Sequence, residues 1–240
     1  MSSTTTESPA ESQSSSLMSS RMGSLLAFAP LSVWTLWHLY ANLSAYEGPH
    51  AWEAAVTAQR APLVEVITST VVLLPLILHT IWGIRRLRIV KVNNVQYGTF
   101  DNLKFLLQRL SAVGVVLFLG AHIYKARIEP MVMHGRHETF GDISFQMHHH
   151  LPTLIVYILG VLGVAYHMAN GLSTGGITWG YAATEKARQR LTLISYLFFV
   201  LLLGMGWGTI YALHNAGEHD RRTERDITAP ATGPGVQSAH

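Results

Sequence analysis

Five stretches of this chain contain no lysine, arginine, aspartate or glutamate. They cover residues 22–46, 66–84, 110–124, 143–184 and 191–217. A helix that crosses a bilayer needs roughly 20 mostly apolar residues, and an open chain in lipid can satisfy its backbone polar groups only as a helix. Charged residues make up 13% of the 240 residues, against about 25% in an ordinary soluble domain. The sequence therefore predicts an all-α membrane protein with five transmembrane helices.

Polar tails flank this apolar region. Residues 1–20 contain 12 Ser or Thr, two Glu and no Lys or Arg, a composition that cannot bury enough apolar surface to fold. We expect a disordered cytoplasmic tail over 1–20, a five-helix transmembrane domain over 21–215 and a flexible tail on the outer side over 216–240. The five helices are expected near residues 24–44, 64–84, 107–127, 151–172 and 191–213.

Lysine and arginine predict the orientation of the helices. The segments on the N-terminal side of the membrane, which include the strongly basic segment 85–109, carry ten of these residues, and the opposite side carries seven. Cytoplasmic loops are enriched in Lys and Arg. We therefore expect the N-terminus in the cytoplasm and the C-terminus on the outer side.

Each of the first four predicted helices carries one histidine: His38, His79, His122 and His167. An ionisable residue in a transmembrane span is costly and is a functional candidate by default. At the helical rise, His38 and His122 lie about 21–22 Å from the cytoplasmic helix ends, and His79 and His167 lie about 8 Å from them. The histidines thus form two layers about 13 Å apart, each layer drawn from alternate helices.

Alternate helices face each other across an up-down four-helix bundle. Two imidazoles in that position suit a haem with two axial histidines, so the first four helices are expected to form an up-down bundle around two haems. A single such histidine could equally be neutral and bonded to a backbone carbonyl. A zinc or copper site using all four would need one coordination sphere, which the two layers exclude. Because the chain has no Cys, thiolate metal sites and disulfides within the chain are excluded.

Glycines stand near these histidines at helical spacing. They are Gly83, Gly114, Gly160, Gly163 and Gly171. They could make room for a porphyrin, or they could let the helices pack closely. The fifth helix has no inward histidine. It carries Gly204 and Gly208, and we interpret it as a packing helix on the outside of the bundle.

Several segments resemble a known family. RLSAVGVVLFLGAHIYKARI (109–128) and VYILGVLGVAYHMANGLSTGGITWGYA (156–182) are similar to the third and fourth helices of the single-subunit, five-helix, dihaem cytochrome b anchor of succinate dehydrogenase and fumarate reductase. SLLAFAPLSVWTLWHLYANL (24–43) and VVLLPLILHTIWGIRRL (71–87) are similar to its first two helices. The resemblance covers about residues 20–215 and includes all four histidines.

The resemblance implies an electron-transfer subunit in a bacterial cytoplasmic membrane. A flavoprotein and an iron–sulfur subunit would oxidise succinate, and this chain would anchor them and pass electrons through two b haems to a quinone, usually menaquinone in this family. His79 and His167 would hold the iron of the inner haem, and His38 and His122 that of the outer haem. The partners are then these two subunits, membrane lipid and quinone, with no nucleic acid and with scope for a higher oligomer of the complex.

Other site assignments are weaker. Ser24, Arg85, Gln108 and Arg109 could bind propionates of the inner haem, although the arginines could equally be ordinary positive flanks. Glu53 and Glu65 are the candidates for a carboxylate that accepts protons at an outer quinone site. Some relatives carry a glutamate two residues before the histidine of the fourth helix. Here that position is Ala165, so a proton route of that kind is not expected.

The outer segment 125–150 holds further histidines: His134, His137, His148, His149 and His150. We interpret them as surface residues in a solvated loop, with a role of the last three near a quinone or propionate as the alternative. His214 is expected at the membrane interface. Two other functions stay open: the dihaem cytochrome b of a quinone-linked hydrogenase or formate dehydrogenase, and a non-redox transporter or assembly protein.

Overall fold

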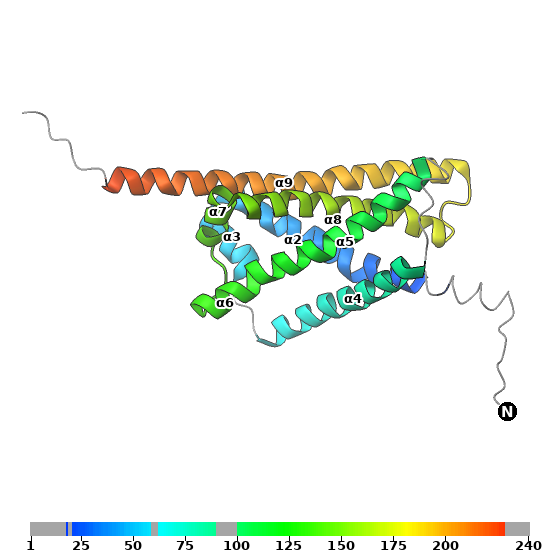
Figure 1. Ribbon diagram of the computed structural model, residues 1–240, viewed down its shortest axis with the longest axis horizontal. Coiled ribbons are helices and arrows are strands. Elements are labelled where there is room, and N and C mark those ends of the chain that lie inside the picture. Colours follow the sequence, from blue (N-terminus) through cyan, green and yellow to red (C-terminus); the bar gives the residue numbers. More distant parts are fainter. Residues whose placement is uncertain (1–17, 19–20, 59–61, 90–99, 229–240) are drawn as a thin grey trace, which may run out of the picture.

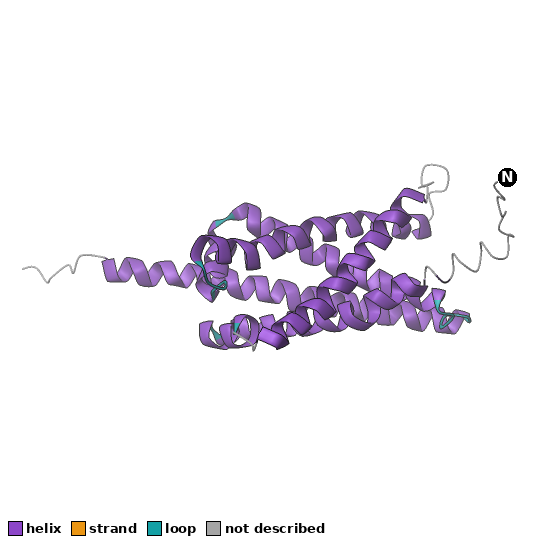
Figure 2. Ribbon diagram, turned by 90° about the horizontal axis from the view of Figure 1, so that it is seen from below, coloured by secondary structure: helices purple, strands orange, loops and turns teal. Residues whose placement is uncertain are grey.

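A computed structural model of the chain describes residue 18 and residues 21–58, 62–89 and 100–228. The remainder of the predicted tail 1–20, the centre of the basic segment 85–109 and the residues after 228 lie outside the described residues. The described chain is helical and contains no strand (Figure 2).

Five helical segments are long and apolar enough to cross a membrane. They are Arg21–Glu47, Pro62–Leu87, Asn102–His134, Leu151–Thr178 and Glu185–Glu218. Each contains one of the five predicted helices and extends beyond it at one end or both. The prediction of an all-α protein with five transmembrane helices is therefore confirmed.

Several of these segments change helical geometry along their length. The first continues from residues 21–26 through the π-helical turn η1 (Ala27–Ser32), α2 (Val33–Asn42) and the 3₁₀ turn η2 (Leu43–Glu47). The third joins α5 (Phe100–Ile123), the π-helical turn η4 (Tyr124–Ile128) and α6 (Glu129–His134). The second, fourth and fifth segments lie within α4 (Pro62–Ile89), α8 (Leu151–Thr178) and α9 (Glu185–Thr228), respectively.

Shorter helices form between the spans. α3 (Pro49–Trp52) and the π-helical turn η3 (Glu53–Thr57) follow the first span, and α7 (Phe140–His149) precedes the fourth. α7 begins with a reciprocal capping box, in which the Asp142 backbone N–H donates to Thr139 Oγ1 and the Thr139 backbone N–H donates to the Asp142 carboxylate. This capping satisfies backbone donors that a helix start leaves unpaired.

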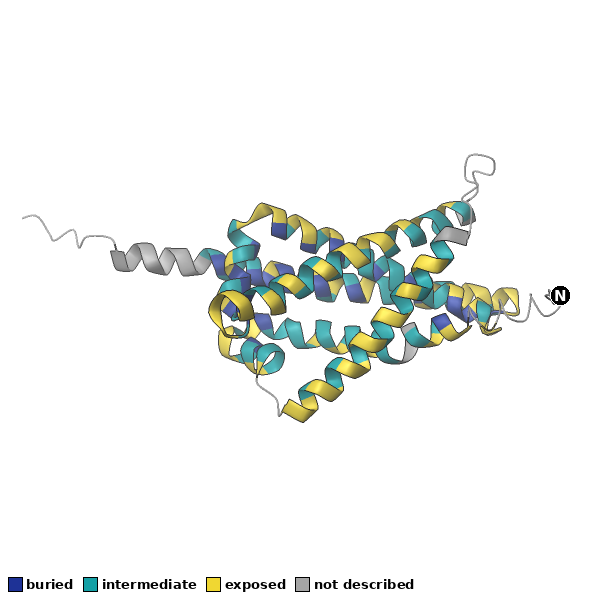
Figure 3. Cartoon of the chain, turned by 60° about the horizontal axis from the view of Figure 1, so that its bottom comes forward, coloured by how far each residue is buried: buried dark blue, intermediate teal, exposed yellow. Residues whose placement is uncertain are grey.

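The long helices run roughly along one axis (Figure 1). α8 and α9 lie side by side, α5 crosses α8, and α4 packs mainly against η1. The packed interior gathers at the end where α3, α7, α8 and α9 meet, and α4 remains largely exposed (Figure 3). In the most apolar window of the second and third spans, 0% of the residues are buried within the chain. The side chains in those two windows are therefore partly buried or exposed rather than fully enclosed within the chain.

α9 is more deeply packed than we expected from the sequence. Its most apolar window is 28% buried, the highest share among the five spans, and Ile210, Ala212 and Leu213 belong to the main core. Its close approach to α8 is made at Gly206, where a side chain would meet Val161. α9 therefore packs against α7 and α8, and it brings no histidine to the pairs described below.

Candidate functional site: two histidine pairs between the helices

The four histidines of the spans meet in two pairs, each made by alternate spans. The ring centroids of His38 and His122 are 5.8 Å apart, and those of His79 and His167 are 6.3 Å apart. The rings of each pair are steeply inclined, at 71° and 73° respectively. The same two pairs were expected from the depth of each histidine along its predicted helix.

Tyr157 of α8 positions the outer pair. Its hydroxyl lies 3.2 Å from His122 Nδ1, and the Phe118 ring stacks on His122 at 5.7 Å. His38 stacks on Trp34, with ring centroids 6.1 Å apart and planes inclined by 17°. Aromatic contacts and one hydroxyl therefore orient the two imidazoles.

The inner pair is held from the opposite end of the spans. His79 Nδ1 donates to the backbone carbonyl of Gly23 at 3.1 Å. His167 Nδ1 lies 3.5 Å from Ser111 Oγ and 3.2 Å from the amide nitrogen of Gln108. Gln108 also donates to the His167 carbonyl and accepts from Asn170 Nδ2. Gln108 therefore links α5 to α8 through hydrogen bonds next to the His167 ring.

These hydrogen bonds bear on which ring nitrogen can bind a metal. A carbonyl accepts only, so His79 must carry its proton on Nδ1, which leaves Nε2 with a free lone pair. Ser111 and Tyr157 each offer a hydroxyl that can accept the Nδ1 proton of His167 and His122, respectively. The amide nitrogen of Gln108 instead favours a bare Nδ1 on His167, so ligation there requires the tautomer that donates to Ser111. Outer contacts of this kind commonly fix the tautomer of metal-binding histidines.

The spacing of the rings fits one metal ion between each pair. An imidazole nitrogen binds a metal at about 2.0–2.1 Å and lies about 1.1 Å from its ring centroid, so two imidazoles on opposite sides of one ion have centroids about 6.2 Å apart. The observed 5.8 and 6.3 Å lie close to this value. Within the described ranges, no three His, Asp or Glu side chains form a group that could hold a metal ion. The arrangement thus suits ions that bring their remaining ligands, as a porphyrin does.

Two of the five predicted glycines leave open space. A Cβ added to Gly83 or Gly114 would meet nothing within 4 Å, and one added to Gly163 or Gly171 would make ordinary contacts at 3.8 Å. Gly160 differs because a side chain there would collide with the Phe118 ring. Close helix packing therefore explains Gly160, whereas Gly83 and Gly114 leave room for a bulky group.

The four residues predicted to bind propionates occupy different environments. Gln108 is engaged with His167 and Asn170, and Arg85 is exposed at the end of its span. Arg109 places its guanidinium 3.5 Å above the Phe105 ring, and its Nε is buried without a hydrogen-bond partner. Ser24 is half-buried near the start of the first span. The unpaired Arg109 Nε is the donor that best suits an additional anionic group.

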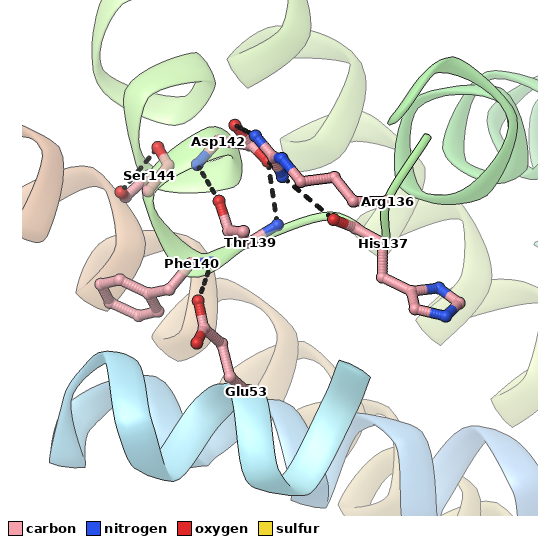
Figure 4. A network of polar contacts seen from close by, with 8 residues as sticks. Glu53, Arg136, His137, Thr139, Phe140, Asp142 and Ser144 are labelled. Atoms are coloured by element: carbon pink, nitrogen blue, oxygen red, sulfur yellow. Dashed lines mark hydrogen bonds and ion pairs between the residues drawn. The ribbon is translucent and has the colours of Figure 1, made fainter. Parts of the chain in front are cut away.

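Both carboxylates predicted for an outer quinone site are already engaged. Glu53 Oε1 accepts from the backbone N–H of Phe140 at 3.1 Å, which fastens η3 to the start of α7 (Figure 4). Glu65 forms an ion pair with Arg127, which also donates to His137 Nδ1. The structure gives each carboxylate a structural contact, and a role in quinone chemistry stays a prediction for both.

The start of α7 is fixed by one arginine (Figure 4). Arg136 donates to both oxygens of Asp142 at 2.5 and 3.0 Å and to the His137 carbonyl at 3.0 Å. The hydrogen bond from Arg136 lowers the pKa of Asp142 to about 2. The same carboxylate takes part in the capping box of α7, so it joins the helix start to the loop before it.

The outer segment is not the solvated loop expected from its composition. Most of its second half forms α7, which buries Phe140, Ile143 and Met147. His148 is half-buried: its Nδ1 donates to the His214 carbonyl at 3.1 Å, and its ring centroid lies 4.6 Å from that of His214. His150 Nδ1 accepts from the Thr153 backbone N–H and caps α8. His148 and His149 therefore lie on a helix rather than in a loop, and both are half-buried, whereas His134 and His150 are exposed.

Glu138 is a candidate that the sequence reasoning missed. It lies between α6 and α7, it is 5% exposed, and its Oε1 is buried without a hydrogen-bond partner. Burial raises its pKa to about 8, with the charges of Asp142 and Glu129 acting in the same direction and Lys125 opposing them. A single glutamate in a polar segment gives no sequence signal of burial.

Comparison with known proteins identifies a relative of this chain. No protein-family model matches the chain. The chain is similar to the succinate dehydrogenase cytochrome b558 subunit of Bacillus subtilis (strain 168), with 28% identity over 197 residues. The match covers 80% of this chain and 94% of that protein. The predicted resemblance to the cytochrome b subunits of succinate dehydrogenase is confirmed.

Proposed function

We propose that this chain, a relative of a succinate dehydrogenase cytochrome b subunit, is the membrane anchor and electron-transfer subunit of a succinate:quinone oxidoreductase. Five spans embed it in the membrane. It has no Cys, so any iron–sulfur cluster bound through thiolates belongs to a partner subunit. A flavoprotein and an iron–sulfur subunit are the partners that the relative's name implies.

The observation that carries the proposal is the pair of imidazole sites. Each site takes one histidine from each of two alternate spans, at a centroid distance that suits one metal ion between two rings. His79 and His167 would hold the inner b haem, and His38 and His122 the outer one. When bound, each haem supplies an iron that accepts and donates one electron.

The two sites lie one beyond the other across the membrane. Tyr157 touches the outer pair and His167 belongs to the inner pair, and their separation along α8 is about 15 Å at the helical rise. The distribution of Lys and Arg supports a cytoplasmic N-terminus and an outer C-terminus. Electrons would enter at the inner pair beside the soluble subunits and leave from the outer pair to a quinone, menaquinone by family resemblance.

Optical spectroscopy of the purified complex tests the haem content. We expect two b haems per chain, with one lost in His79→Ala or His167→Ala and the other lost in His38→Ala or His122→Ala. His134→Ala is a matched control because that histidine is exposed, and it should retain both. Absence of haem from the wild type, or loss of the same haem in His38→Ala and His79→Ala, would contradict the proposal.

Co-purification tests the enzyme complex. The tagged chain, expressed in its own cells, should retain a flavoprotein and an iron–sulfur subunit, and the preparation should reduce a quinone with succinate. The alternative of a hydrogenase or formate dehydrogenase cytochrome predicts other partners and no activity with succinate. The name of the relative favours succinate dehydrogenase.

A further inference from the structure

Glu138 is a buried acidic residue at the outer end of the helices. Four acidic residues of this end have partners: Glu53 accepts from the Phe140 backbone, Glu65 pairs with Arg127, Glu129 with Lys125 and Asp142 with Arg136. Glu138 is 5% exposed, and no hydrogen bond reaches its buried Oε1. Burying an ionised carboxylate without a partner costs free energy. Burial therefore favours the protonated form of Glu138.

Charged residues of α6, α7 and η4 influence the protonation of Glu138. Asp142 of α7 and Glu129 of α6 favour its protonated form, and Lys125 of η4 favours its ionised form. Together with burial, they place its pKa at about 8. Glu138 can therefore exchange a proton near neutral pH, which the ion-paired Asp142 cannot do.

Tyr157 links Glu138 to the outer histidine pair. Its charge acts on the phenol of Tyr157, whose hydroxyl lies 3.2 Å from His122 Nδ1. Tyr157 is 9% exposed and belongs to the same core as Phe140 and Met147. In a core of this kind charges are poorly screened, so a charge arriving at the outer pair changes the affinity of Glu138 for a proton.

We propose that Glu138 is the proton-exchanging group of the outer redox site. Glu138 binds one proton from water on the outer side when the iron between His38 and His122 gains one electron, and it releases that proton when the electron leaves for the quinone. Proton uptake would form one O–H bond on the Glu138 carboxylate and release would break it, and the proton would offset the charge of the one electron held at the outer pair. The inference rests on the proposed haem at this pair.

Redox titration of the purified complex at a series of pH values tests the proposal. One proton per electron is a tenfold change per pH unit, equivalent to about 59 mV for a one-electron couple. In the wild type, the potential of the outer haem should fall with rising pH by up to that slope around the Glu138 pKa of about 8. Glu138→Gln should lose most of the slope, and the inner haem should respond alike in both proteins.

Glu129→Gln is the matched control. That glutamate is paired with Lys125 and raises the pKa of Glu138 only through its charge. The variant should keep the slope and move it to lower pH. An outer potential that is independent of pH in the wild type, or an equal slope in Glu138→Gln, overturns the inference and leaves the proposed function standing. Absence of haem from the wild type overturns both.

Infrared difference spectra give a second measurement in case Glu138→Gln fails to assemble. Reduction of the wild-type complex should produce the band of a newly protonated carboxylic acid. Glu138→Asp keeps a carboxyl group and should retain that band at a shifted position. A reduced-minus-oxidised spectrum of the wild type without a protonated carboxyl band overturns the inference.

Discussion

Replacing Tyr157 with phenylalanine removes one atom from the outer histidine site. The lost hydroxyl is the hydrogen-bond partner of His122 Nδ1, at 3.2 Å. The aromatic ring remains, and with it the contact to Phe118 at a centroid distance of 5.5 Å. The substitution therefore isolates the polar contact from the packing.

The expected loss of haem affinity follows from the His122 Nδ1 group, which is left without its hydrogen-bond partner. A buried polar group that loses its partner costs about 1–3 kcal/mol, and about 1.4 kcal/mol corresponds to a tenfold change in affinity. Haem should therefore bind the outer pair about 5- to 150-fold more weakly. Loss of an outer-shell partner of a metal-binding histidine typically costs about 10- to 100-fold, which agrees with this range.

Haem titration of the apo-complex, followed by absorbance, measures both sites in one experiment. The outer site should weaken in Tyr157→Phe, and the inner site, whose histidines contact Gly23, Gln108 and Ser111, should not. Tyr166→Phe is the control because that hydroxyl donates to the Lys104 carbonyl, at 3.4 Å, and not to a histidine ring. Equal weakening of both sites, or wild-type binding at the outer site, would refute the reasoning.

Two further predictions concern stability at the outer end. Gly217→Val places a side chain against the backbone of α7 and should destabilise the protein by about 1–3 kcal/mol; thermal unfolding in detergent should show this loss, whereas Gly204→Val, with nothing within 4 Å, should not. Asp142 has a pKa of about 2 against its usual 3.8, so its contribution to stability is complete above pH 3.8 and is lost as pH falls toward 2. Arg136→Gln should remove that acid-dependent contribution, measured as the pH dependence of unfolding, and an unchanged acid limb would contradict it.

The spans and the partnership of the histidines could be predicted because each depends on a property that is local along the chain. Stretches without charge mark the spans, and the position of a histidine within its span gives its depth. His38 and His122 share one depth and His79 and His167 another, so alternate spans sufficed to pair them. These are the pairs that lie within 5.8 and 6.3 Å in the structure.

The outer end could not be predicted in the same way because its burial arises between elements. The polar, histidine-rich composition of segment 125–150 led us to expect a loop where α7 forms. Thr139 and Asp142 nevertheless have the spacing of a capping box. Glu138 lies just before α7, and its 5% exposure arises only in the folded chain. The π-helical turns η1, η3 and η4 likewise have no single residue type that marks them.

α9 is longer than a bilayer is thick. Its 44 residues extend about 66 Å as a continuous helix, whereas a bilayer with its headgroups is about 40–45 Å thick. Enclosing the whole helix would require a tilt of about 47°, beyond the observed range of about 0–40°. At least one end of α9 must therefore project out of the membrane as a rod, and any neighbour that approaches this end must pass around it.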